Sequence, residues 1–167
     1  MANNRQLLSV FSGIAVLVIF FIFSSCAQTQ SQSMEQEQVT FTKEGTLEVR
    51  NLEKDSVLAQ FNIEFAETDY EIQTGLMYRE KLGNSEGMLF LFKTEAPHAF
   101  YMKNTLIALD LLFIRSDSSI AHIARNAKPL DESSIPSGAP VQFVLEINAG
   151  LSTQLGIKEG HKVSWQR

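Results

Sequence analysis

The segment Phe100–Thr105 (FYMKNT) combines aromatic, cationic and hydrogen-bonding side chains within a short stretch. If the segment is extended, Tyr101, Lys103 and Thr105 share one side, because side chains alternate along a strand. A lysine among aromatic rings can bind an anion or a sugar oxygen, and Asn104 and Thr105 can donate and accept hydrogen bonds. The alternative is a lysine that extends into solvent beside a turn formed by Asn104 and Thr105. The segment is therefore a candidate binding site.

Two carboxylates interrupt otherwise apolar stretches, Asp110 in LDLLFI and Glu146 in VQFVLEI. An unpaired carboxylate is costly to bury, so we expect each to face solvent or to meet a cation. Arg79 and Lys103 are the available cations, which favours a structural ion pair. The alternative is a general acid and base, because glycosidases use such a pair of carboxylates.

Other kinds of chemistry have little support in this sequence. It has one cysteine, no G-x-S-x-G motif and no phosphate-binding glycine loop. Thioethers can bind Cu(I), but methionine more commonly packs in a core, and we expect packing for Met77, Met88 and Met102. The histidines lack the spacing of metal ligands, and we expect structural roles for His98, His122 and His161. We predict no metal site and no cofactor.

The charge balance is mildly acidic. The chain carries 14 basic and 19 acidic residues, for a formal net charge of -5, and no cluster of lysine or arginine offsets it. Nucleic acid carries a dense negative charge that such a protein does not attract. We therefore predict no nucleic-acid partner.

The N-terminus has the pattern of an export signal. A basic residue, Arg5, precedes a long apolar run that closes with Ser24, Ser25 and the single cysteine, Cys26. This ending resembles the bacterial lipobox, in which the cysteine is lipidated and becomes the new N-terminus. The alternative is an uncleaved membrane helix, which leaves the position of the cysteine unexplained. We predict a lipoprotein signal segment over residues 1–25 and a lipid anchor on Cys26.

A polar tether over residues 26–38 (CAQTQSQSMEQEQ) separates this anchor from one domain over residues 39–167. The apolar residues of the domain mostly alternate, which is the strand period. Alternation on both sides of Glu44–Gly45 predicts a hairpin there. Further strands are predicted at 61–65, 87–92, 98–104, 109–115, 119–125, 140–147 and 161–166.

Two helices are expected beside these strands. Thr68 and Glu71 form a capping-box pattern, and Arg79 and Lys81 suit the end of the same helix. Gly75 then lies within the helix, where close backbone packing would require it. The second helix would cover residues 149–155. The fold class is therefore mainly β: a compact β-sandwich or jelly-roll-like barrel with one or two short helices at its rim.

Four stretches together carry a resemblance to one family. They are GLMYR at 75–79, GMLFLF at 87–92, FYMKNT at 100–105 followed by LDLLF at 109–113, and VLEINAG at 144–150 followed by GIKEG at 156–160. In order and spacing they resemble the domain of unknown function 192 (DUF192) over about residues 58–165. Tyr101 stands where the family more often has tryptophan, and His161 where aspartate is commoner. The resemblance implies a jelly-roll-like β-sandwich and frequent export, and it implies no activity.

The sequence thus predicts a lipoprotein of a bacterial envelope, at the periplasmic face or the outer membrane, whose domain binds a ligand without catalysis. The membrane, through Cys26, is the one partner it identifies. The alternatives are a hydrolase that uses Asp110 and Glu146, and a structural partner of another envelope protein. The candidate binding residues are Arg79, Tyr101, Lys103, Asn104, Thr105, Asp110 and Glu146.

Overall fold

The structure is a computed structural model that describes residues 40–51, 53–54 and 56–167. The predicted signal segment, Cys26 and the tether lie outside the described residues. Within the described ranges, no helix has the length and apolar character needed to cross a membrane.

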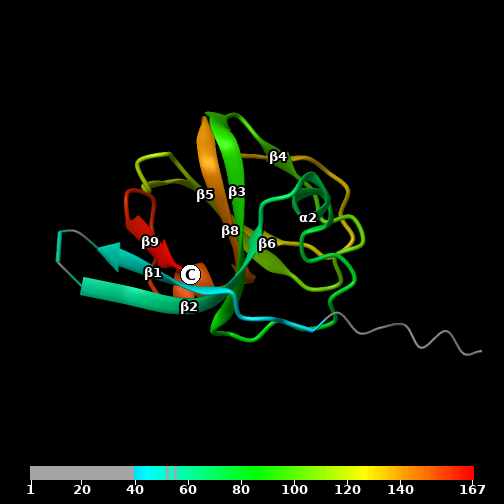
Figure 1. Cartoon of the computed structure of the whole chain (residues 1–167), viewed down its shortest axis with the longest axis horizontal. Coiled ribbons are helices and arrows are strands. Elements are labelled where there is room, and N and C mark those ends of the chain that lie inside the picture. Colours follow the sequence, from blue (N-terminus) through cyan, green and yellow to red (C-terminus); the bar gives the residue numbers. More distant parts are fainter. Residues whose placement is uncertain (1–39, 52, 55) are drawn as a thin grey trace, which may run out of the picture. The chain divides into compact units, whose positions relative to one another are not determined.

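Seven strands form the main sheet, in the order β6-β5-β8-β3-β2-β1-β9 (Figure 1). Neighbouring strands are antiparallel except for β2 and β3, which are parallel. The strands are β1 (Gly45–Asn51), β2 (Ser56–Ala66), β3 (Glu86–Ala96), β5 (Leu109–Ile114), β6 (Ile120–Ala127), β8 (Val141–Asn148) and β9 (Lys162–Gln166). A second, two-stranded sheet pairs β4 (Ala99–Phe100) with β7 (Ile135–Pro136).

The two outer strands of the main sheet meet at one point. Ser119 and Lys162 form an isolated bridge, and the Ile120 amide donates to the His161 carbonyl at 2.9 Å. The sheet is therefore strongly curved but does not close into a barrel. The prediction of a mainly β fold with one or two short helices is confirmed. The main sheet is not a closed barrel.

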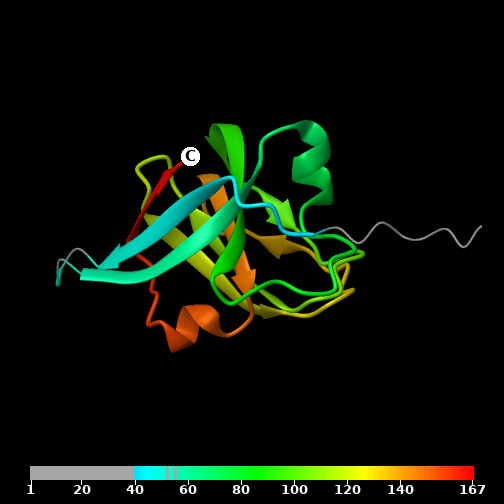
Figure 2. The same ribbon diagram turned by 60° about the horizontal axis from the view of Figure 1, so that its bottom comes forward.

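Side chains alternate between two apolar layers on opposite faces of this sheet. Leu112 and Leu145 belong to one layer, and their neighbours Leu111 and Val144 to the other. Helix α3 (Leu151–Gln154) packs on the first face through Leu151. Helix α2 (Asp69–Thr74) lies within the crossover that parallel strands β2 and β3 require, on the second face. Figure 2 shows the two helices on opposite sides of the sheet.

The capping box of α2 is present as predicted. The Glu71 amide donates to Thr68 Oγ1 at 3.2 Å, and the Thr68 amide donates to Glu71 Oε2 at 2.9 Å. The predicted extent of the helix was wrong, because α2 ends at Thr74 and Gly75 is its C-cap with a φ of 49°. A Cβ at Gly75 would lie 3.0 Å from Cζ of Phe90, so glycine permits both the turn and the close approach.

Two strand predictions need correction. No hairpin turns at Glu44–Gly45: β1 begins at Gly45 and pairs with β2 across the turn that follows Asn51. Glu44 binds β2 through its amide, which donates to the Ile63 carbonyl at 2.9 Å, and through its side chain, which accepts from the Phe65 amide at 2.6 Å. The predicted strand at 98–104 is reduced to β4, because the chain turns at residues 103–104.

Candidate ligand-binding site

A cavity of about 210 Å³ lies on the α2 face of the sheet. Its wall combines the end of α2 and the turn after it, strand β3, strand β4 with its flanking residues, and one residue of β8. The lining residues are Ile72, Gln73, Thr74, Gly75, Leu76, Met77, Phe90, Phe92, His98, Ala99, Phe100, Tyr101, Thr105 and Glu146. This surface joins apolar and aromatic side chains to a comparable share of polar groups, and polar groups in a concave site can fix the orientation of a ligand.

Packed rings fix the aromatic side of the cavity. Phe100 meets Phe90 edge to face with ring centroids 5.2 Å apart, and it meets Phe92 edge to face at 6.3 Å. The imidazole of His98 stacks on Phe92 with centroids 3.7 Å apart. Edge-to-face and offset contacts favour particular ring orientations, so these contacts hold the wall in one geometry.

Glu146 is the acidic group of the cavity. On β8 it pairs in register with Met88 of β3 and Leu111 of β5, so its side chain enters the apolar layer under α2. It is 6% exposed, and no other described residue forms a hydrogen bond or ion pair with its carboxyl group. Burial raises the pKa of Glu146 to about 8. The carboxyl group is therefore protonated at neutral pH in the free protein.

His98 places a second unsatisfied polar atom in this region. Its Nε2 is buried and has no hydrogen-bond partner among the described residues. Burial lowers the pKa of His98, and a hydrogen bond with the Val141 backbone opposes this shift only in part. The imidazole is therefore neutral at pH 7, and Nε2 has no hydrogen-bond partner among the described residues.

Gly75 brings the end of α2 close to Glu146. A Cβ at Gly75 would lie 3.9 Å from Oε2 of Glu146, and the ring of Phe90 is closer still. The helix end therefore forms part of the cavity wall directly beside the carboxyl group.

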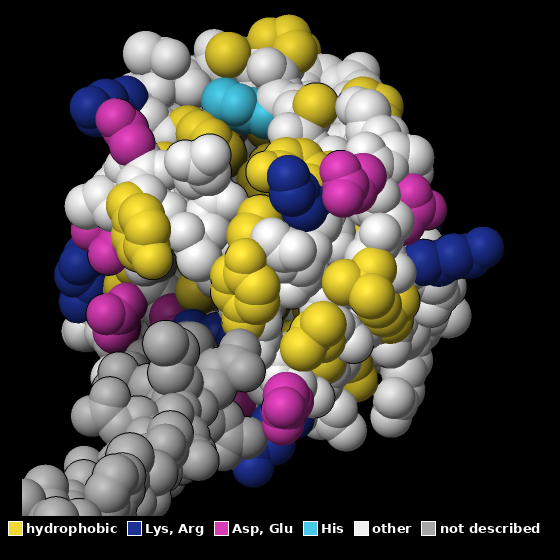
Figure 3. Space-filling model, turned by 90° about the vertical axis from the view of Figure 1, so that its right-hand side faces the viewer, with side chains coloured by type: hydrophobic (Ala, Val, Ile, Leu, Met, Phe, Trp, Pro, Cys, Tyr) yellow, Lys and Arg dark blue, Asp and Glu magenta, His cyan; other side chains and the backbone are white. Residues whose placement is uncertain are grey.

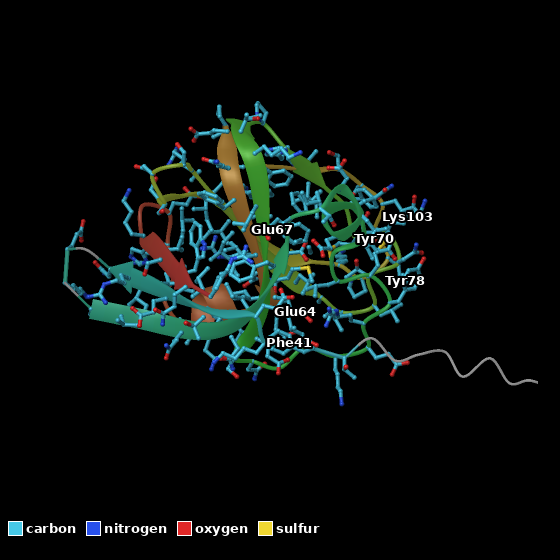
Figure 4. The ribbon with its side chains drawn as sticks, viewed as in Figure 1. Phe41, Glu64, Glu67, Tyr70, Tyr78 and Lys103 are labelled. Carbon is cyan, nitrogen blue, oxygen red and sulfur yellow. The ribbon has the colours of Figure 1, made fainter. Side chains whose placement is uncertain are left out.

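Three of the predicted binding residues line the cavity, namely Tyr101, Thr105 and Glu146. Lys103 does not: it is exposed, and Figure 4 shows it extending outward at the edge of the domain. Asn104 lies at the rim, where its Nδ2 donates to the Tyr78 hydroxyl at 2.8 Å and its carbonyl accepts from the Tyr78 amide at 2.8 Å. It joins the loop after α2 to the turn at 103–104.

Asp110 belongs to a different environment. Its side chain is fully buried on the α3 face, where Oδ2 accepts from the Ser152 amide at 3.0 Å and from the Ser152 hydroxyl at 2.6 Å. Oδ1 accepts from the Asn126 amide at 2.9 Å. The expectation that Asp110 faces solvent or a cation was wrong, because backbone and hydroxyl donors satisfy the carboxylate instead.

Arg79 is not among the residues that line the cavity, although its amide donates to the carbonyl of the lining residue Leu76 at 3.4 Å. Its Nη2 lies 2.6 Å from Glu64 Oε2 on β2, and both side chains are buried. Oε1 of Glu64 accepts from the Thr42 amide at 2.8 Å. Arg79 therefore pairs with Glu64, and the predicted pairing with Asp110 or Glu146 was wrong. Figure 4 places Glu64 beside Phe41, away from Lys103.

Sequence reasoning missed His98 and Gly75 as parts of the site. His98 was expected to be structural, because no second histidine stands at a ligand spacing. The phenylalanines Phe92 and Phe100 on either side of it were the available signal, since a histidine between aromatic residues can line an aromatic wall. Within the residues that the structure describes, no three His, Cys, Asp or Glu side chains converge on a point that could hold a metal.

Hydrophobic side chains surround this region of the surface, and Figure 3 shows several of them exposed on the face of α2. Tyr101 and Leu106 are 42% and 45% exposed, and they flank the turn at 103–104. Tyr78 contacts Asn104 in that turn, and the Leu130 amide donates to the Thr105 carbonyl at 3.1 Å. The segment 101–106 is thus surrounded by exposed apolar groups.

Solved structures of two bacterial proteins are similar to this chain. One is a protein of unknown function from Novosphingobium aromaticivorans DSM 12444, 42% identical, with a TM-score of 0.68 over 72% of this chain and 84% of that one. The other, from Sinorhizobium meliloti 1021, is described as a proposed transcription regulator. It is 35% identical, with a TM-score of 0.71 over 77% of this chain and 97% of that one. No curated protein matches the chain significantly.

The family model of DUF192, described as an uncharacterised ACR, matches residues 50–165. That range contains every residue that lines the cavity. The four sequence stretches, the family model and the two structural relatives agree, and this chain belongs to the DUF192 family.

Proposed function

We propose that this protein is a bacterial envelope lipoprotein whose DUF192 domain binds a small ligand, without catalysis, in the cavity beside Glu146. One observation carries the binding proposal: Glu146, a residue that is 6% exposed, places a carboxyl group without a partner among the described residues in a cavity with an aromatic wall. Burying such a group without a hydrogen bond costs free energy. A ligand that forms a hydrogen bond or ion pair with this carboxyl group would offset that cost. The unpaired carboxyl group therefore favours a cavity that binds a ligand over one that has only a structural role.

The hydrolase alternative has no geometric support. An acid and base pair must flank one bond, with carboxyl groups about 5–10 Å apart across an open cleft. In register, Asp110 pairs with Ile147 and Glu146 pairs with Leu111, so the two side chains enter opposite faces of the sheet. A layer of backbone separates them, and they cannot act on the same bond.

The anchor proposal is supported by the sequence alone. The apolar run, the small residues that follow it and the single cysteine at position 26 together favour lipidation. Cys26→Ser should leave an unprocessed precursor that incorporates no labelled fatty acid. Labelling equal to that of the natural protein would contradict the anchor.

A role in transcription regulation, which the description of the Sinorhizobium relative suggests for that protein, is not part of this proposal. The formal net charge of -5 and the absence of a lysine or arginine cluster in the sequence disfavour binding to a polyanion.

A second candidate function is contact with another envelope protein, and the exposed apolar groups around segment 101–106 favour it. Two variants separate the two functions. Glu146→Gln replaces the ionisable carboxyl group of the cavity wall with a neutral amide and should alter ligand binding, whereas Leu130→Ser changes an exposed surface residue outside the cavity lining. Ligand binding lost on Leu130→Ser and retained on Glu146→Gln would contradict the cavity proposal.

A further inference from the structure

We infer that the ligand of this cavity is a small organic cation, a protonated amine on a compact apolar body. The inference deepens the proposed binding function and rests on it. Three features of the cavity lead to it: the charges in its lining, the hydrogen-bonding character of its polar atoms, and its aromatic wall.

The lining offers an anionic ligand no opposite charge. No lysine or arginine is among the residues that line the cavity, and its histidine, His98, is neutral at pH 7. Glu146 is the sole carboxylic acid of the lining. An anion would meet no opposite charge here and would keep Glu146 protonated, whereas a cation would meet a group that can become its counter-ion.

Three polar side chains of the wall, those of His98, Thr105 and Glu146, can act as acceptors. Because Nε2 of His98 has no partner, the hydrogen bond to the Val141 backbone uses Nδ1, which leaves a lone pair on Nε2. The Thr105 hydroxyl donates to the Lys103 carbonyl at 3.4 Å, so its oxygen can still accept. Glu146, once ionised, is an acceptor as well. An ammonium group has up to three N–H donors and no acceptor, which fits this set.

The aromatic wall also favours a cationic ligand. The rings of Phe90, Phe92 and Phe100 are held against one another at the cavity, and Tyr101 is beside them. A cation close to an aromatic face is attracted by the ring quadrupole, more strongly where water is excluded. The rings also cover the apolar body that carries the amine.

The size of the cavity sets the scale of the ligand. An engineered apolar cavity of about 150 Å³ holds benzene. A cavity of about 210 Å³ therefore has room for a single ring or a short branched chain with its amine.

Binding of a cation should release a proton. Glu146 is protonated in the free protein and must ionise to pair with an ammonium group, because a low-dielectric site strengthens the attraction between them. The other titratable groups of the lining are His98, already neutral, and Tyr101. Proton release on binding is thus the signature of this mode, and a neutral or anionic ligand would not show it.

Three probes of matched shape test the inference on the full chain in a non-ionic detergent: benzylamine, benzyl alcohol and benzoate. Calorimetry in two buffers of different ionisation enthalpy measures both the affinity and the protons released. Benzylamine should bind most tightly at pH 7, release close to one proton, and bind about tenfold more tightly for each unit of pH from 6 to 7. Shift changes in the NMR spectrum at Phe90, Phe92 and His98 should place it in the cavity.

Glu146→Gln should abolish both the preference for benzylamine and the proton release, while Glu132→Gln, which changes an exposed carboxylate, should alter neither. Thermal unfolding of each variant identifies loss of fold. Tighter binding of benzyl alcohol or benzoate in the cavity would overturn the cation inference and leave the binding function standing. Binding by none of the three probes would overturn both. Two further results would overturn the cation inference and leave the binding function standing. One is binding of benzylamine without proton release, and the other is binding of benzylamine to the Glu146→Gln variant as tightly as to the natural protein.

Discussion

Asp110 and Glu146 lie one residue out of register on neighbouring strands, and their carboxyl groups therefore enter opposite faces of the sheet. Asp110 receives hydrogen bonds from Ser152 and Asn126, while Glu146 receives none from any described residue. The two acids interrupt similar apolar sequences, yet one completes a structural network and the other lines a cavity.

The first prediction concerns Asp110. Replacement by alanine leaves the buried amide of Ser152 and the amide of Asn126 without their acceptor and should lower the free energy of unfolding by about 2–5 kcal/mol. Denaturant unfolding measures the loss. The matched control is Asp131→Ala, whose exposed carboxylate bonds only to Ser133 nearby and should cost about 1 kcal/mol or less. Equal, small losses for both variants would contradict the network.

The second prediction concerns the pH dependence of stability. Burial raises the pKa of Glu146 to about 8 in the folded chain, whereas in the unfolded chain its pKa is near the ordinary value of 4.5. Between these values the folded state holds more protons than the unfolded state, so its contribution to stability falls as the pH rises. Glutamine does not titrate. Glu146→Gln should therefore gain stability relative to the natural protein between pH 5 and 8, by up to about 5 kcal/mol.

Unfolding free energies of both proteins at a series of pH values test this difference. The lowered pKa of His98 acts in both proteins, so it cancels in the comparison. A difference that is constant from pH 5 to 8 would mean that Glu146 titrates normally in the fold.

The third prediction concerns the buried pair of Arg79 and Glu64. Arg79→Met strands the Glu64 carboxylate and should cost about 3–5 kcal/mol. The double variant Arg79→Met with Glu64→Gln removes both charges, and it should recover a large part of the loss because no buried charge is left alone. Chemical denaturation of the single and double variants gives the coupling. Strictly additive losses would show that the two groups do not interact.

The fourth prediction separates Lys103 from Asn104. Lys103 is exposed, and Lys103→Ala should change the free energy of unfolding by no more than about 0.5 kcal/mol and leave ligand binding intact. Asn104 has a φ of 55° and bonds to Tyr78, so Asn104→Ala should cost about 1–2 kcal/mol. Asn104→Gly, which tolerates that backbone conformation, should cost less than Asn104→Ala. Thermal unfolding ranks the stabilities of the three variants. A reversed order would contradict the structural role of Asn104 in the turn at 103–104.

The sequence was sufficient for the features that depend on local periodicity and capping. Alternating apolar residues predicted strands that became β2, β5 and β8, and the pattern of Thr68 and Glu71 predicted the start of α2. The requirement for close packing at Gly75 was also predicted, although the glycine ends the helix instead of lying within it.

The environments of Asp110 and Glu146 could not be predicted in the same way. They depend on the register between strands that are far apart in the chain, such as the pairing of Glu146 with Met88 and Leu111. A shift of one residue would exchange the faces of both acids. Local sequence does not specify this register, so the two carboxylates looked alike until the sheet was assembled.

The proposed binding of a cation depends most on the protonation state of Glu146, and carboxyl-carbon NMR measures that protonation state directly. With the side-chain carboxyl carbon of glutamate labelled, and Glu146→Gln used for assignment, the Glu146 signal should titrate with a midpoint near pH 8 in the free protein. Saturating benzylamine should move the midpoint below pH 7, because the bound ammonium group favours the ionised carboxylate. A midpoint near the ordinary value of 4.5 that benzylamine leaves unchanged would contradict both the buried, unpaired acid and the cation that we infer beside it.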